Sequence, residues 1–175
     1  MLYFAYGSNM QTATFRGRRR IEFTRAFAAR APGWRVTLDK PPLIPIGESF
    51  ANLLRDPDAT ALGVVYEVTE ADVEHLELTE GVPIGNYHRT EIAIVPLVST
   101  GPSRTAITLV SERRDSALRP SRRYMACLIA GAEEHGLPAE YVAALRAIPA
   151  GDESEEARRL RPEIDRFLRN RGGAS

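Results

Sequence analysis

Hydrophobic and polar positions follow two periods along the chain, which separate a strand-rich first part from a helical last part. Residues 2–6 form a short apolar and aromatic run that is typical of a buried strand, and Gly7-Ser8-Asn9 interrupts it abruptly. Further apolar or alternating stretches predict strands over residues 23–30, 34–38, 50–54, 62–68, 90–98 and 105–110. A short helix is expected just before Gly17.

A helical period first appears after Thr69. Asp72 follows Thr69 at the spacing of a capping box, and Val73 and Leu76 begin an apolar stripe. Ser121 is positioned to cap a second helix that ends at His135-Gly136, and Pro138 opens a third. Strands that come first and helices that come last predict an α+β fold with a largely antiparallel or mixed sheet.

The segment over residues 153–169 is mostly charged but has one apolar side. Its members lie at helical spacing: Ala157, Leu160, Ile164, Phe167 and Leu168. We expect this stripe to pack on the rest of the chain or on a second copy, as in a homodimer. The expected division is a domain over residues 1–150, an amphipathic helix over 151–170 and a frayed tail over 171–175.

Two stretches rich in proline and aspartate predict irregular structure. Residues 39–49, "DKPPLIPIGES", contain prolines that remove donors and fix φ, so a surface loop is expected there. Residues 55–60, "RDPDAT", are expected to form a turn between two strands.

The composition fits an ordinary globular protein and argues against binding to nucleic acid or membranes through net charge. The 175 residues are 43% hydrophobic and 26% charged, which fits one globular domain with its own core. Lys+Arg and Asp+Glu both number 23, so no net field favours nucleic acid or a membrane surface. The single cysteine, Cys127, allows no disulfide within the chain and is compatible with a reducing cytosol. Lys40 is the only lysine, a bias that we attribute to genomic base composition.

Three candidate systems give no catalytic pattern. His75, His88 and His135 lie in unrelated contexts without the spacing of metal ligands, so surface or packing roles are expected. Residues 47–51, "GESFA", resemble a nucleophile elbow, but a strand is expected after them where that motif needs a helix. Cys127 lies among apolar residues of a predicted helix, as an inert buried thiol would.

A polar loop and one glutamate remain. The loop at residues 7–9 is either an ordinary Asx-type turn or a cradle whose N–H groups bind an anion. Glu80 lies where a helix meets a glycine-rich turn, near Tyr87. It is either a solvated turn residue or a general acid/base at the mouth of a cavity, with its pKa raised by apolar neighbours.

Three blocks in order resemble the γ-glutamylcyclotransferase-like family, which includes AIG2-like proteins and γ-glutamylamine cyclotransferases. They are "YFAYGSN", then "LGVVYEVTEADVEHLELTEGVPIGNYHRTEIAI" and "YMACLIAGAEEHGLPAEYVAALRAI". With the segments between them they span roughly residues 2–150. The resemblance implies a mixed fold around a small, partly closed β-barrel with flanking helices. It also implies cyclisation of a γ-glutamyl group to 5-oxoproline. Because the nucleophile in that reaction belongs to the substrate, no metal or organic cofactor is expected.

The resemblance also assigns roles to residues. The family's catalytic glutamate falls on Glu80, and the substrate-binding positions fall on Tyr6, Gly7, Ser8, Asn9, Tyr87 and Tyr124. Where related enzymes carry a strand tyrosine near the pocket, this chain has Thr108. That departure concerns the side of the site that would receive the leaving group.

Three functions therefore stay open. The first is a cyclotransferase that acts on γ-glutamyl-amino acids, releasing 5-oxoproline and a free amino acid. The second is a relative that acts on γ-glutamyl amines or on a γ-glutamylated metabolite. The third is a non-catalytic module that binds γ-glutamyl compounds or 5-oxoproline, although a negative Glu80 beside a carboxylate ligand argues against it.

Overall fold

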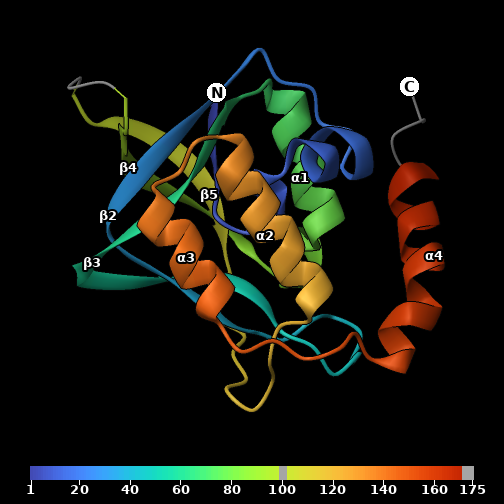
Figure 1. The fold of residues 1–175 in the computed structure, drawn as a ribbon. Coiled ribbons are helices and arrows are strands. Elements are labelled where there is room, and N and C mark those ends of the chain that lie inside the picture. Colours follow the sequence, from blue (N-terminus) through green and yellow to red (C-terminus); the bar gives the residue numbers. More distant parts are fainter. Residues whose placement is uncertain (99–101, 171–175) are drawn as a thin grey trace.

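Five strands close into a barrel in the computed structural model, which describes residues 1–98 and 102–170 (Figure 1). The strand order around the barrel is β1-β3-β2-β4-β5. Strand β1 pairs with β5 in parallel, and the other neighbouring pairs are antiparallel. The strands are β1 (Leu2–Ala5), β2 (Arg25–Lys40), β3 (Phe50–Glu67), β4 (His88–Pro96) and β5 (Arg104–Val110). This barrel with flanking helices confirms the expected fold class.

Strands β2 and β3 form one long hairpin where four shorter strands were expected. Its register shifts between Pro32, which pairs with Thr60, and Trp34, which pairs with Arg55. The predicted turn at residues 55–60 is therefore wrong, because the segment is an irregularity inside a continuous strand. A bulge absorbs residues that a regular ladder excludes, such as Pro57, which has no N–H to donate.

The helices begin close to their expected caps. Helix α1 (Glu70–Glu80) has the Thr69–Asp72 capping box, and Ser121 caps α2 (Arg122–Glu134) by accepting from the N–H of Tyr124. Helix α3 (Ala139–Ala147) follows α2 in a hairpin against the barrel. Helix α4 (Glu155–Asn170) stands on the other side of the molecule from α3 (Figure 1). In the described ranges, none of the helices combines the length and apolar character needed to cross a membrane.

Short helical turns connect these elements. The first, η1 (Ser8–Met10), follows β1, and η3 (Val82–Ile84) follows α1. The expected short helix before Gly17 is the π-helical turn η2 (Ala13–Arg18), which includes that glycine. Its Phe15 is fully buried, with its ring centroid 5.7 Å from that of Tyr3 and 4.2 Å from that of Tyr66. Burying a side chain of this size contributes about 1.5–3 kcal/mol, so this contact fixes η2 on the barrel.

Helix α4 packs on η2 and the 41–49 loop. Ala157 is buried, and the Arg18 Nε atom donates to Asp165 Oδ1 at 2.8 Å. At the start of the helix, the Ser154 N–H donates to Glu48 Oε1 at 3.1 Å. The side chains of Phe167 and Leu168 and the tail over 171–175 lie outside the described residues. The division of the chain at Ala150 stays a prediction.

Candidate active site

A cavity of about 690 Å³ lies at one end of the barrel. The strand pairing brings the C-terminal ends of β1, β2 and β5 to this end, together with the N-terminal ends of β3 and β4. The C-terminal end of α1, one face of α2 and one face of α4 complete the wall. All seven residues assigned to the site from the sequence line this cavity: Tyr6, Gly7, Ser8, Asn9, Glu80, Tyr87 and Tyr124.

Glu80 is the last residue of α1, and its carboxylate faces two donors. Gly81 ends the helix with φ at 77°, a left-handed conformation that favours glycine. The Glu80 Oε1 atom accepts from Asn9 Nδ2 at 3.0 Å and lies 2.8 Å from Arg19 Nη2. Neither contact involves Oε2, which leaves that oxygen free to accept a proton from a bound molecule. The Glu80 side chain is 15% exposed, so a ligand can reach it.

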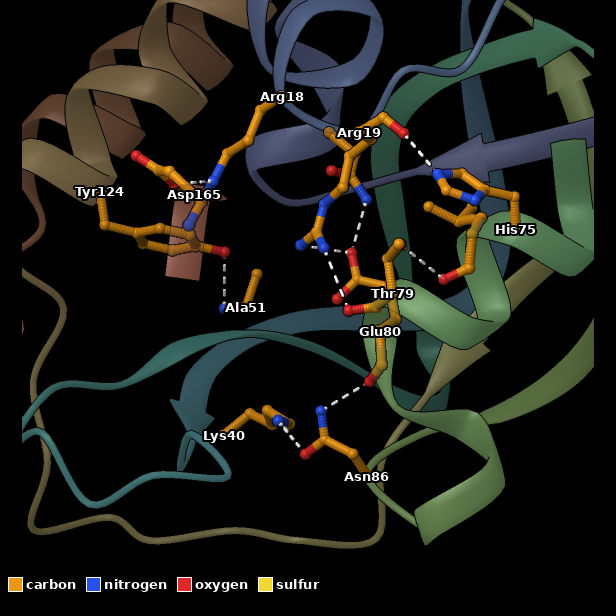
Figure 2. Close-up of polar contacts among 12 residues, drawn as sticks. Arg18, Arg19, Lys40, Ala51, His75, Thr79, Glu80, Asn86, Tyr124 and Asp165 are labelled. Atoms are coloured by element: carbon orange, nitrogen blue, oxygen red, sulfur yellow. Dashed lines mark hydrogen bonds and ion pairs between the residues drawn. The ribbon is translucent and has the colours of Figure 1, made fainter. Parts of the chain in front are cut away.

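Arg19 was not recognised from the sequence, where it is the middle residue of a run of three arginines. Figure 2 shows how two neighbours fix its position. Its Nη1 atom donates to the Thr79 carbonyl at 3.2 Å, and its own carbonyl accepts from His75 Nε2 at 2.9 Å. Glu80 therefore has polar neighbours, Asn9 and Arg19, which the sequence did not predict. His75 contacts the Arg19 backbone, as the expected packing role allows.

The loop after β1 folds into the turn η1. The Met10 N–H donates to the Gly7 carbonyl at 3.0 Å, and the Gln11 N–H donates to the Ser8 carbonyl at 3.1 Å. The first N–H groups of such a turn have no acceptor inside it, and the backbone of Ser8 faces the Tyr124 hydroxyl. Asn9 is 8% exposed, and its Oδ1 atom is buried without a hydrogen-bond partner in the described part of the chain.

Gly7 lies against Tyr124 and Ala51. A Cβ atom added at Gly7 would stand 3.0 Å from Tyr124 Oη and 3.3 Å from Ala51 Cβ. Its φ is −116°, outside the left-handed region that favours glycine, so it is lack of space that favours glycine here. The Tyr124 hydroxyl accepts from the Ala51 N–H at 2.9 Å, which places this ring at the cavity wall (Figure 2).

The tyrosines of the site are neutral hydroxyl groups. Burial raises the pKa of Tyr6, Tyr87 and Tyr124 above the ordinary tyrosine value. Tyr6 donates its hydroxyl to the Leu109 carbonyl, which fixes that ring against β5. These side chains can shape the cavity and donate hydrogen bonds, but they do not supply a base near neutral pH.

Lys40 is the second residue that sequence reasoning missed. The 39–49 segment was expected to be a surface loop, yet Lys40 is 2% exposed, and Ile46, Glu48 and Ser49 are also buried. Its Nζ atom donates to Asn86 Oδ1 at 2.6 Å and lies 4.4 Å from the centroid of the Tyr87 ring. In the sequence, the only hint that Lys40 is special is that it is the single lysine of the chain.

Helix α4 contributes an apolar wall. Leu160 and Ile164 line the cavity from one side, and Leu43 and Ile44 line it from the 41–49 loop. Cys127 is half-buried and also lines the cavity, so its expected place in the core is wrong. The reason is that the face of α2 that carries it lies toward α4.

Two further features considered in the sequence, Thr108 and the "GESFA" segment at residues 47–51, have structural roles. Thr108 is fully buried and donates to the Phe4 carbonyl at 2.8 Å, joining β5 to β1. It therefore serves the barrel and does not replace a tyrosine in the cavity wall. Residues 47–51 lead into β3, so the helix that a nucleophile elbow requires is missing there.

Comparison with known proteins places this geometry in context. A model of the AIG2-like family matches residues 61–145. The γ-glutamyl cyclotransferase aclK of Aspergillus oryzae is 30% identical over 163 residues, which cover 82% of this chain and 59% of that protein. Human γ-glutamylcyclotransferase is 26% identical over 165 residues, covering 86% of this chain and 80% of the human protein.

A solved structure of a γ-glutamyl cyclotransferase superposes along nearly the whole chain. Its TM-score is 0.75 at 26% sequence identity, and the match covers 97% of this chain and 98% of that one. YkqA from Bacillus subtilis has a TM-score of 0.72 at 23% identity, over 86% of this chain and 56% of that one. The latter likeness concerns the fold alone.

Proposed function

This chain belongs to the γ-glutamylcyclotransferase family, which includes the AIG2-like proteins, and we propose that it is an enzyme that cyclises a γ-glutamyl-amino acid. The products would be 5-oxoproline and the free amino acid. The observation that carries this proposal is the pairing of Glu80 Oε1 with Asn9 Nδ2 and Arg19. It leaves the second carboxylate oxygen of Glu80 outside these two contacts, on a side chain that lines the cavity.

The second carboxylate oxygen of Glu80 suits a substrate ammonium. A carboxylate only accepts hydrogen bonds, so the Asn9 amide must present its nitrogen to Glu80 and turn its oxygen elsewhere. The α-ammonium of a γ-glutamyl group has three donors. One of them would reach Glu80 Oε2, which pairs the ammonium with the carboxylate.

The reaction follows from that placement. Glu80 takes a proton from the α-ammonium, and the freed amine attacks the γ-carbonyl carbon of the same substrate molecule. A bond forms between the α-nitrogen and this carbon, which closes the five-membered ring. Glu80 passes its proton to the leaving nitrogen, and the bond from the γ-carbonyl carbon to that nitrogen breaks. The ring nitrogen gives up its second proton, again through Glu80, to the released amine, which leaves as an ammonium. Because the nucleophile belongs to the substrate, no covalent enzyme intermediate forms.

The loop at residues 7–9 would stabilise negative charge. Its first N–H groups are suited to the substrate's α-carboxylate or to the oxyanion that develops on the γ-carbonyl oxygen. Tyr6, Tyr87 and Tyr124 would form the wall around the folded glutamyl chain. The absence of a side chain at Gly7 makes room for Tyr124 and Ala51, which would hold this loop in place.

A second candidate substrate class has an observation of its own. The apolar surface from Leu160, Ile164, Leu43 and Ile44 would accommodate a bulky or hydrophobic leaving group. That feature favours γ-glutamyl amines or γ-glutamylated metabolites. A binding module without turnover is the third alternative.

One experiment separates these functions. The purified chain is incubated with γ-glutamyl-alanine, a γ-glutamyl amine, a γ-glutamyl conjugate with a large apolar group, and glutathione, and 5-oxoproline is followed by mass spectrometry. Turnover of γ-glutamyl-alanine supports the main proposal, and turnover of the amine or the conjugate alone supports the second. Binding of 5-oxoproline without turnover of any compound would leave only the module.

A further inference from the structure

Lys40 is a cation buried at the cavity wall. It is the only lysine of the chain, and it ends β2 at the cavity wall with 2% of its surface exposed. Its polar contact is with a neutral oxygen, Asn86 Oδ1, at 2.6 Å. In residues 1–98 and 102–170, no Asp or Glu oxygen lies within the 4.0 Å limit of an ion pair with Nζ. Burying such a charge is costly unless an anion compensates it.

Arg113 increases the local positive charge. Its Nη1 atom donates to the same Asn86 Oδ1 at 3.0 Å, and its Nη2 atom donates to the Pro42 carbonyl at 3.1 Å. Two cations therefore share one neutral oxygen. Burial lowers the pKa of Lys40 to about 8, and Arg113 adds to this effect while Glu80 opposes it. Lys40 still carries its charge near neutral pH.

Asn86 connects this cationic group to Glu80. Its Nδ2 atom donates to the Glu80 carbonyl at 2.8 Å, while its oxygen accepts from Lys40 (Figure 2). In the same view Lys40 and Asn86 lie on one side of Glu80, and the Arg19 guanidinium lies on the other. A substrate whose reacting atoms lie at Glu80 would therefore have a second charged contact available near Lys40.

We infer that Lys40, oriented by Asn86 and reinforced by Arg113, binds the carboxylate of the leaving amino acid. This inference rests on the proposed function and specifies its substrate class. A γ-glutamyl-amino acid has two carboxylates, and the loop at residues 7–9 is suited to the one on the glutamyl end. The other carboxylate would complete the charge balance at Lys40. Lys40 would thus select γ-glutamyl-amino acids over γ-glutamyl amines.

A purely structural role for Lys40 makes a different prediction. If its ammonium only ties β2 to Asn86, its loss would affect all substrates alike. Comparing γ-glutamyl-alanine with γ-glutamyl-alaninamide separates the two roles, because the compounds differ only in the leaving group's carboxylate. The relevant quantity is the ratio of kcat/KM for the acid to kcat/KM for the amide.

We expect Lys40→Met to lower this ratio by about tenfold or more, the usual effect of losing a charged hydrogen bond. The loss should appear mainly in KM for the acid. Lys40→Arg keeps the charge and should restore part of the ratio. Arg123→Gln removes another cation that lines the cavity and should leave the ratio unchanged. An unchanged ratio in Lys40→Met would overturn the inference.

A binding measurement tests the same contact without turnover. Because Lys40 is the only lysine, protein labelled with ¹³Cε-lysine gives a single side-chain signal whose titration can be followed by NMR. The probes are N-acetyl-γ-glutamyl-alanine and its alaninamide, in which the acylated amine cannot cyclise. An anion beside Lys40 favours its charged form, so the acid should raise the titration midpoint and the amide should not.

These experiments distinguish failure of the proposed cyclotransferase activity from failure of the proposed role of Lys40. A selective rise with the acid, in a protein that turns over no γ-glutamyl compound, would support the anion site and contradict the cyclotransferase. Turnover of γ-glutamyl-alanine with equal midpoints for both probes would support the cyclotransferase and overturn the role of Lys40. Midpoints that move with neither probe overturn that role as well.

Discussion

Asn9 and Glu80 lie 71 positions apart in the sequence, and the Asn9 Nδ2 atom donates to Glu80 Oε1 at 3.0 Å. The contact joins the turn after β1 to the C-terminal end of α1. It uses one carboxylate oxygen and fixes the orientation of the amide, so neither this contact nor the one from Arg19 occupies the other carboxylate oxygen. The proposed base and the proposed substrate loop are thus one hydrogen-bonded unit.

Replacing Glu80 tests the proposed base directly. Glu80→Gln keeps the shape and can still accept from Asn9, but it cannot carry a proton between two nitrogens. We expect turnover to fall by at least about two orders of magnitude, the usual scale for a general acid/base. The variant should remain folded by circular dichroism and should still bind 5-oxoproline.

Glu74 provides a matched control on the same helix. It is exposed, so Glu74→Gln should change rate and stability little. Wild-type turnover in Glu80→Gln would remove both the mechanism and the site assignment.

A side chain at Gly7 should displace Tyr124. The added Cβ atom of Gly7→Ala would lie 3.0 Å from the hydroxyl oxygen, closer than ordinary van der Waals contact. We expect a loss of about 1–3 kcal/mol in stability, as for other overpacked sites, with lower kcat/KM. Gly7→Val, with a branched side chain, should abolish activity.

A double-mutant cycle identifies the cause of that loss. Tyr124→Phe removes the hydroxyl, so Gly7→Ala should cost measurably less stability in this background. The control is Gly17→Ala, because a Cβ atom there meets nothing within 4 Å. Equal costs of Gly7→Ala in both backgrounds, measured by urea unfolding, would rule out the steric explanation.

Removing α4 should open the cavity without removing the proposed base. A chain that ends at Ala150 loses Leu160, Ile164 and the Arg18–Asp165 contact but keeps Glu80, Asn9 and Arg19. We expect a higher KM, a smaller change in kcat and a lower Tm. Size-exclusion chromatography would show whether the oligomeric state changes as well. Arg18→Gln, which removes only the ion pair, should have a milder effect in the same direction. Complete loss of turnover in a folded truncated protein would contradict this expectation.

Local signals in the sequence predict where the elements of this fold begin, but they do not predict how long the strands are. Thr69 and Asp72 mark the start of α1 because a capping box depends on neighbouring residues alone. The long β2–β3 hairpin was divided into four strands because Gly33 and Pro57 usually end strands. Only pairing with the opposite strand converts these residues into an irregularity inside the sheet.

The same limit applies to the candidate site. Glu80 and the loop at residues 7–9 could be named because a helix end and a strand end are visible in the pattern. Arg19 could not, since its orientation depends on how Phe15 packs η2 between Tyr3 and Tyr66. Lys40 precedes two prolines, so its sequence resembles that of a solvated loop, but the fold buries its side chain. The roles of all these residues stay predictions.

The charge of Lys40 should make substrate selection depend on pH. Burial lowers its pKa to about 8, so the side chain is a cation below that value and becomes neutral as the pH rises through it. If the cation binds the leaving carboxylate, kcat/KM for γ-glutamyl-alanine should fall above about pH 8 relative to γ-glutamyl-alaninamide. The amide corrects for titration of the substrate's α-amine, which both compounds share. Lys40→Arg carries its charge at all these pH values, so its acid-to-amide ratio should stay constant across the same range. A ratio that falls equally in Lys40→Arg would assign the pH dependence to another group.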